Sequence, residues 1–430
     1  IVGPAAVIAA GTMGAGAVAS LILAGAWFRY DLLWVVLVIL PLFVVSVDTS
    51  SRIGTLTPEE GMFALIRRQI NPGVAWLLLL INVPVHVLIM MGQVSVMTSA
   101  LLSTFGFYPP QPDSVANYTD NYGIAEVVLG ILCAAAILWL VLSHGYKRMQ
   151  RAMTGLMILM FVCFLVVAFR GFIELPDILT GFIPSIPPDL ERPDGPPRIA
   201  TSSIIAMAGA ALAPAALLGM PYLSEDAKQT ASDLKENFRR SIVNLGVIFG
   251  AYAIFVVIAG GFALYPLANN AEIETVHEAG RVLHSAFPEP FTATGSIIFS
   301  LGVFTAAITT LIVAAQVTAY FCLDMVNKSW HFTADNRLFH LVLITLIMGA
   351  AILAPFWTFP AMLKVVLLMG INVLVIPMVY VVLIYLVNVR SVVGEYTAEW
   401  WRNGLLLLGL ALSIALAIHK VPHYIETLTG

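Results

Sequence analysis

Few side chains in this sequence could bind a solute or carry a proton, and three of them share one predicted helix face. Asn82, His86 and Gln93 stand at i, i+4 and i+11 within the apolar run 74–105, which places them on the same side of a helix. The charge of an imidazole changes near neutral pH. We therefore predict that His86 binds substrate or carries a proton, with a structural histidine bonded to a neighbouring helix as the alternative.

Other polar residues within apolar runs are weaker candidates. Threonines in membrane helices more often donate to their own backbone than to a ligand. Thr309 is included in the predicted site, and the candidates of lower rank are Thr305, Thr310 and Asn372. Acidic residues near predicted helix ends are expected to pair with nearby basic residues or to form a gate; the acidic residues are Asp48, Glu225, Asp226 and Asp324, and the basic ones Arg52, Lys228 and Lys328.

Two stretches of small residues could supply backbone groups in place of side chains. Residues 11–20 read GTMGAGAVAS and residues 207–219 read MAGAALAPAALLG. A break in a helix within a membrane persists only where it is buried or lines a cavity, and paired breaks are typical of transporters built from inverted repeats. The free amides and carbonyls would form a ligand site at mid-membrane. The alternative is that these residues only allow close helix packing.

The predicted substrate site combines the two stretches with the polar side chains. Its members are Gly14, Ala15, Gly16, Ala17, Ala213, Pro214, Ala215, Asn82, His86 and Thr309. No metal site, resident cofactor or set of nucleophile and base is predicted, so the chain is not expected to be an enzyme. The cysteines, Cys133, Cys163 and Cys322, lie in apolar runs and are predicted to be small core residues.

The elements that would position these residues are membrane helices. The chain has 430 residues, of which 60% are hydrophobic and 11% are charged, whereas soluble domains contain about 25% charged residues. Neither the net charge of −4 nor the placement of Lys and Arg indicates a nucleic-acid partner. Runs near the roughly 20 residues that span a bilayer predict eleven helices. They lie at about 3–28, 32–50, 74–105, 122–143, 150–173, 200–223, 241–265, 292–325, 338–356, 361–389 and 404–419.

The arrangement of these runs predicts one integral membrane domain, 1–430, placed in the cell membrane. Helices one to five form a first repeat, 1–173, helices six to ten a second repeat, 200–389, and helix eleven occupies 404–420. Fourteen of the 21 Lys and Arg residues fall on the side that holds the N-terminus, which predicts a cytoplasmic N-terminus. No removable signal peptide is expected.

Three longer stretches resemble one known family. GPAAVIAAGTMGAGAVASLILAGAWFRYDLLWVVL, SSRIGTLTPEEGMFALIRR and AGAALAPAALLGMPYLSEDA are similar to the first helix, the segment after the second helix and the sixth helix of the NRAMP divalent-metal transporters. The resemblance implies an all-α polytopic protein with a LeuT-type 5+5 inverted repeat, interrupted helices one and six, and transport by alternating access.

The chain departs from that family where the family binds metal and moves protons. The Asp-Pro-Gly-Asn motif of helix one is replaced by Gly14–Ala17, and the Met-Pro-His motif of helix six by Ala213–Ala215. His86 and Ile89 stand at the positions of two acidic residues on helix three, and Ile308 stands at a Gln position. Gly and Ala offer a divalent ion only backbone carbonyls, so the ordinary proton-coupled Mn/Fe mechanism is not expected.

These observations predict an NRAMP-related secondary transporter for a small solute or ion. The amides at the start of a half-helix form an anion site, so the substrate is expected to be a small anion or organic acid. The first alternative is a divalent metal cation, still hydrated and held by carbonyls. The second is a non-transporting sensor or receptor on the same scaffold. Coupling ion, direction and oligomeric state are left open.

Overall fold

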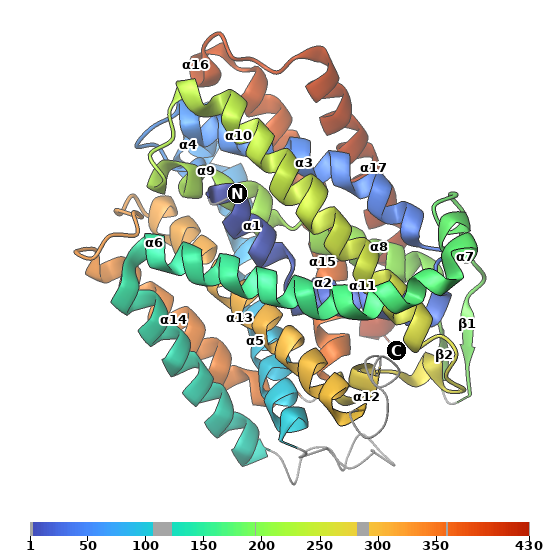
Figure 1. Ribbon diagram of the computed structural model, residues 1–430. Coiled ribbons are helices and arrows are strands. Elements are labelled where there is room, and N and C mark those ends of the chain that lie inside the picture. Colours follow the sequence, from blue (N-terminus) through green and yellow to red (C-terminus); the bar gives the residue numbers. More distant parts are fainter. Residues whose placement is uncertain (1–2, 106–122, 194, 282–291, 358–359, 430) are drawn as a thin grey trace.

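The computed structural model describes residues 3–105, 123–193, 195–281, 292–357 and 360–429 (Figure 1). Within them almost all regular structure is helical, and the strands form one antiparallel hairpin, β1 (Leu190–Arg192) and β2 (Gly195–Arg198). The helices of the first part are α1 (Pro4–Thr12), α2 (Ala15–Phe28), α3 (Leu33–Leu56), α4 (Met62–Gln69), α5 (Pro72–Thr104), α6 (Gly123–Gly171) and α7 (Leu175–Thr180). Those of the second part are α8 (Ala200–Ala211), α9 (Pro214–Asp226), α10 (Leu234–Ser241), α11 (Phe249–Ala263), α12 (Val276–Gly280), α13 (Thr292–Met325), α14 (Arg337–Leu353), α15 (Ala361–Asn388), α16 (Arg390–Val393) and α17 (Trp400–Thr429). A π-helical segment, Ile242–Ile248, joins α10 to α11.

The all-α membrane fold is confirmed, but the count of eleven spanning helices is not. In the described part of the chain nine helices are long and apolar enough to cross a membrane, or ten if α1 and α2 form one bent span. The runs predicted at 122–143 and 150–173 both lie in α6, whose two legs diverge in Figure 1. The first leg contains one of the nine candidate spans, Ala125–Ser143, and the side chains of several residues of the second leg lie outside the described ones.

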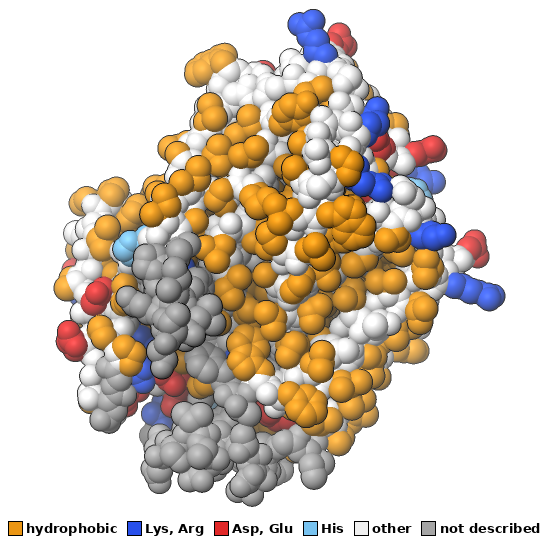
Figure 2. All heavy atoms as spheres, turned by 180° about the vertical axis from the view of Figure 1, so that it is seen from behind, with side chains coloured by type: hydrophobic (Ala, Val, Ile, Leu, Met, Phe, Trp, Pro, Cys, Tyr) orange, Lys and Arg blue, Asp and Glu red, His pale blue; other side chains and the backbone are white. Residues whose placement is uncertain are grey.

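The surface agrees with a bilayer environment. A broad band of hydrophobic side chains crosses the face seen in Figure 2, and charged side chains gather toward the ends of the molecule. Large apolar residues on different helices are exposed on the surface of the molecule, among them Leu80, Trp139 and Val381. Such residues would face water in a soluble protein, whereas in a membrane they contact lipid.

Several helices begin at a proline that cannot continue the hydrogen-bond ladder. α1 opens at Pro4 and α9 at Pro214, and a proline is tolerated there because the amide of that position has no helical partner. α5 opens at Pro72 after Asn71, whose side chain accepts a hydrogen bond of 2.6 Å from the Gly73 amide. The prolines therefore contribute directly to where these helices start.

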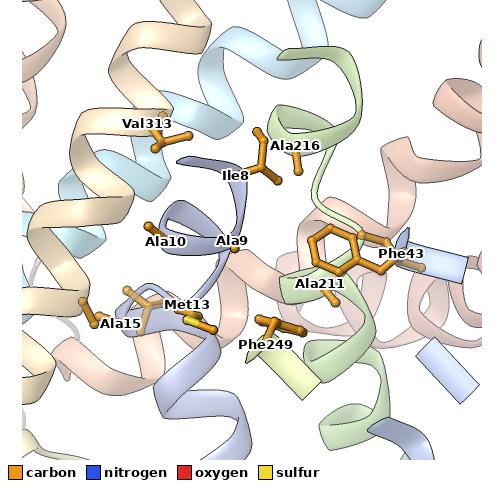
Figure 3. Close-up of a cluster of buried hydrophobic side chains, with 14 of the residues drawn as sticks. Ile8, Ala9, Ala10, Met13, Ala15, Phe43, Ala211, Ala216, Phe249 and Val313 are labelled. Carbon is orange, nitrogen blue, oxygen red and sulfur yellow. The ribbon is translucent and has the colours of Figure 1, made fainter. Parts of the chain in front are cut away.

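The core surrounds the short helices α1, α2, α8 and α9. Figure 3 shows apolar side chains of these helices packed against Phe43 of α3, Phe249 of α11 and Val313 of α13. The long helix α13 packs along α5, and α15 packs on both α5 and α8. Cys133 and Cys322 are free thiols that are only partly buried, so their prediction as core residues stays a prediction, and the side chain of Cys163 lies outside the described residues. Four short helices thus lie enclosed by long ones.

Candidate substrate site

The first predicted weak stretch contains a helix end followed by a new helix start. α1 ends at Thr12 and α2 begins at Ala15, with an angle of 51° between the two helices. The Met13 amide donates to the carbonyl of Ala9 at 2.9 Å, and the first amide bond of α2 runs from Val18 to Gly14 at 3.0 Å. The carbonyls that close α1 and the amides that open α2 therefore have no partners within their own helices.

The second weak stretch has the same organisation. α8 ends at Ala211 and α9 begins at Pro214, while the two halves remain close enough in direction to form one span, Ala200–Asp226. The Leu212 amide donates to the carbonyl of Ala208 at 2.9 Å, and the ladder resumes where the Leu217 amide donates to Ala213 at 3.2 Å. Pro214 has no amide hydrogen, so it cannot close this gap.

A cavity of about 50 Å³ lies between the two gaps. One water needs roughly 10–15 Å³ by this measure, so the cavity has room for about three to five waters or one small ion. The predicted site residues that line it are Gly14, Gly16, Ala17, His86, Ala213 and Ala215. Thr310 and Asn372, which ranked lower in the sequence, also line it. The backbone gaps and His86, distant in sequence, are brought together at this cavity.

Four predicted site residues do not line the cavity. Asn82 donates from Nδ2 to the carbonyl of Leu78 at 2.7 Å, and Thr309 donates from Oγ1 to Ala306 at 2.9 Å. Both side chains thus bond their own helix, the usual behaviour of buried polar residues there. The remaining two, Ala15 and Pro214, lie at the starts of α2 and α9 but are absent from the cavity lining.

His86 has one engaged and one unengaged ring nitrogen. Its side chain is 1% exposed, and Nδ1 lies 2.9 Å from Oγ1 of Thr318. Thr318 already donates its hydroxyl proton to the carbonyl of Ala314 at 2.6 Å, so Nδ1–H of His86 must be the donor to Thr318. The neutral ring then carries a lone pair on Nε2, to which no described residue offers a hydrogen bond.

Two further cavity residues come from α15. Asn372 donates from Nδ2 to the carbonyl of Gly209 at 3.2 Å, and its Oδ1 has no partner among the described residues. The sulfur of Met369 lies 4.0 Å from Nδ2 of Asn372. A Cβ at Gly16 would lie 2.8 Å from the terminal methyl group of Met369, so this glycine permits close packing. Sequence reasoning missed Met369, although it stands one helical turn before Asn372.

The cavity is lined by neutral groups. None of its lining residues is a carboxylate, and the described residues contain no group of three or more His, Cys, Asp or Glu side chains that could hold a metal ion. The N-terminal ends of α2 and α9 bring partly positive amides, and the C-terminal ends of α1 and α8 bring partly negative carbonyls. The polar or sulfur-bearing side chains of the lining are one imidazole, one amide, one thioether and the hydroxyls of Thr12 and Thr310.

The end of α9 remote from the cavity is tied to α13. Tyr222 of α9 donates to Asp324 of α13 at 2.6 Å, and Tyr320 of α13 donates to Asp226 of α9. The two tyrosine rings stack with their centroids 5.1 Å apart. Nδ1 of His331, in the segment after α13, lies 3.7 Å from the carboxylate of Asp226, which raises the pKa of the imidazole by favouring its charged form. α9 is therefore anchored where it leaves the cavity region.

A cavity between two helix gaps, enclosed by long apolar helices, is the arrangement of a multi-pass membrane protein with a LeuT-type fold. Solved structures agree. A manganese transporter from Eremococcus coleocola matches with a TM-score of 0.75 at 16% identity over 100% of this chain and 87% of its own. MhsT in complex with L-phenylalanine matches with a TM-score of 0.61 at 13% identity over 94% and 98% of the two chains. Mhp1, a nucleobase-cation-symport-1 family transporter, matches with a TM-score of 0.59 at 12% identity over 99% and 93%.

The family follows from the sequence itself. Residues 5–421 match the family model described as Nramp, natural resistance-associated macrophage protein-like. The chain therefore belongs to the Nramp family, which confirms the resemblance noted from its sequence. No curated protein sequence matches the chain.

Proposed function

We propose that this Nramp-family protein is a secondary transporter that carries a small anion together with a proton by alternating access. One observation supports this most strongly: His86, whose Nε2 has no hydrogen-bond partner among the described residues, lines a cavity that has two half-helix N-termini and no carboxylate in its lining. A carboxylate-free site at the positive ends of two helices favours negative charge.

The tautomer of His86 supports coupling between the anion and a proton. Neutral His86 presents a lone pair at Nε2, which repels an anion, whereas protonated His86 presents an N–H donor and a positive charge. Binding of the proton and binding of the anion then favour each other. The two together carry no net charge, which lowers the cost of placing them in a low-dielectric site.

The volume of the cavity restricts the size of the anion. About 50 Å³ accommodates an ion of one to four heavy atoms, such as chloride, nitrate or formate. A larger organic acid would require a wider state of the same site. We propose the small inorganic or one-carbon anions as the first substrates to test.

A divalent metal ion is the second candidate, and the side chains of α15 favour it. Nε2 of His86, the sulfur of Met369 and Oδ1 of Asn372 belong to residues of one cavity, and nitrogen and sulfur donors suit softer ions. Membership of the Nramp family and the fold shared with a manganese transporter point the same way. We rank it second because all three donors are neutral, so the full charge of the ion would stay uncompensated in an apolar surrounding.

We also propose the membrane arrangement that the sequence predicts. The excess of Lys and Arg on one side supports a cytoplasmic N-terminus. The corresponding positions of the two helix gaps support repeats at 1–173 and 200–389.

A ligand-stabilisation experiment on the purified protein tests the proposal. Thermal unfolding is measured with sodium chloride, nitrate, formate or acetate, and with manganese, cobalt or iron supplied as sulfates, against a sodium sulfate blank. A true ligand at a hundred times its Kd contributes about 2.7 kcal/mol. We expect a small monovalent anion to stabilise the wild type and the Thr309→Val control, and to lose its effect in His86→Gln.

Two results would overturn this proposal. Stabilisation by the metal sulfates alone, lost in Met369→Leu, would establish the second candidate. Stabilisation by neither class would exclude a small-ion site at this cavity. Uptake into proteoliposomes of whichever ion stabilises the protein then shows whether the ion is transported.

A further inference from the structure

Each helix gap leaves one glycine carbonyl without its helical donor, and a side chain from a distant helix donates in its place. In a continuous helix the Ala15 amide would donate to Gly11, but Gly11 accepts instead from Oγ1 of Thr310 in α13 at 2.6 Å. At the second gap Gly209 accepts from Nδ2 of Asn372 in α15 at 3.2 Å. At both gaps, a side chain from another helix thus bonds the carbonyl that the break leaves free.

The close approach of α13 and α15 depends on glycine. A Cβ added to Gly14 would lie 1.4 Å from Oγ1 of Thr310, and a Cβ added to Gly209 would lie 1.9 Å from the carbonyl oxygen of Met369. Real Cβ atoms do not come so near to other atoms, so any other residue would push the donor helix away. The glycines of both stretches therefore serve the contacts that replace the missing backbone bonds.

The hydroxyl of Thr310 differs in this respect from its neighbours on α13. Thr309 and Thr318 donate to carbonyls of α13 itself, whereas Thr310 donates to another helix. α13 and α15 are continuous and pack on α5, so they form a frame against which the short helices can move. Any motion of α1 away from α13, or of α8 away from α15, must break the corresponding bond.

We infer that Thr310 and Asn372 are positioning residues, whose hydrogen bonds to Gly11 and Gly209 hold the broken helices in the present state and so set the side from which the cavity is reached. The inference uses the alternating access of the proposed function but not the identity of the substrate. Breaking one bond removes stabilisation from this state alone, so the equilibrium between the two access states must shift.

Cysteine accessibility measures that equilibrium without any substrate. In a background where Cys133, Cys163 and Cys322 are replaced by serine, a reporter Ala216→Cys is placed in the cavity lining. A membrane-impermeant thiol reagent is added to right-side-out or inside-out vesicles, and the ratio of the two labelling rates is measured. A net hydrogen bond is worth about a two- to tenfold change in that equilibrium.

We expect Thr310→Val and Asn372→Leu each to change the ratio two- to tenfold, and Thr310→Ser to restore it. The matched controls Thr309→Val and Asn82→Leu remove bonds within one helix and should leave the ratio unchanged. Thermal unfolding of every variant separates a shift in access from a loss of folding. Thr310→Ala and Asn372→Asp replace any variant that does not fold, and the same shift is expected of them.

Either of two results overturns the inference. One is an unchanged ratio in the folded variants of both residues, and the other is an equal change in the matched controls. Because no substrate is present, a shifted ratio supports the positioning role even where the anion proposal fails in the stabilisation experiment.

Discussion

Replacing His86 by leucine separates a functional histidine from a structural one, because the two predict opposite balances of stability and transport. The variant loses the Nδ1–H bond to Thr318, 2.9 Å long, whose net worth is about 0.5–1.5 kcal/mol. Thr318 keeps its own acceptor at Ala314, so no new unpaired donor appears. The variant also removes Nε2, a buried polar atom with no partner among the described residues, and such an atom costs about 1–3 kcal/mol.

The two effects oppose each other, and the state of Nε2 decides which is larger. If the cavity is dry around Nε2, His86→Leu should raise the free energy of unfolding by up to about 2 kcal/mol, and if a water bonds Nε2, it should lower it by about 1 kcal/mol. Transport should fall to background in either case, since no other described residue of the cavity lining has an ionisable side chain. A functional residue that costs stability is a familiar outcome of selection for activity.

Two assays on the same preparations check this prediction. Thermal unfolding in detergent gives the stability change, where about 1 kcal/mol corresponds to a degree or two for a chain of this size. Uptake into proteoliposomes is measured between about pH 5.5 and 7.5, around the ordinary titration range of histidine. A loss of more than about 2 kcal/mol, with residual uptake that keeps the wild-type pH profile, would refute the reasoning and make His86 a structural residue.

Three further predictions concern groups outside the cavity. Gln93 is 0% exposed, and both polar atoms of its side-chain amide lack partners among the described residues. Gln93→Leu should therefore raise the free energy of unfolding by about 1–3 kcal/mol, seen as a higher unfolding midpoint, without changing uptake. Arg402 is 1% exposed and donates to Asp48 at 2.7 Å. Arg402→Met should lower the free energy of unfolding by about 3–5 kcal/mol, because the buried carboxylate of Asp48 loses its partner, and adding Asp48→Asn should recover most of that stability. Asp226 raises the pKa of His331 in the folded protein. The pair therefore contributes its full stabilisation below the pKa of histidine in the unfolded chain, near 6.5, and loses it as the pH rises through the pKa of His331 in the folded protein. The difference in unfolding midpoint between wild type and His331→Gln should therefore shrink from pH 6 to pH 8.

The fold was accessible from the sequence because the membrane imposes a length and a composition on each helix. Nine of the helices that the apolar runs predicted are long and apolar enough in the described part of the chain to span a membrane, and the match to the Nramp family over residues 5–421 confirms the resemblance. The sequence did not predict that the runs 122–143 and 150–173 belong to one helix, α6, because the polar connector between them is typical of a loop. Polar residues are compatible with helical backbone hydrogen bonds, so the composition of the connector could not decide between a loop and a helix.

Only the part of the site that the backbone forms could be predicted from the sequence. Glycine, alanine and proline mark a weak helix locally, which located both gaps, whereas the partner of a polar side chain depends on which helices meet. Asp48 was expected to pair with a nearby basic residue such as Arg52, but it pairs with Arg402, 354 residues away. The free nitrogen of His86 likewise follows from Thr318, on a helix 232 residues distant.

The same lone pair on His86 distinguishes the two candidate functions by the sign of a pH effect. A metal ion bound at Nε2 competes with a proton for that lone pair, so acid should weaken its binding. An anion bound near Nε2 is attracted by the proton there, so acid should strengthen its binding. Because Nδ1–H is committed to Thr318, the ring cannot serve both ligands by exchanging its tautomer without breaking that bond. The direction in which affinity changes between pH 7.5 and pH 5.5 therefore reports what the cavity binds, even before a transported substrate is known.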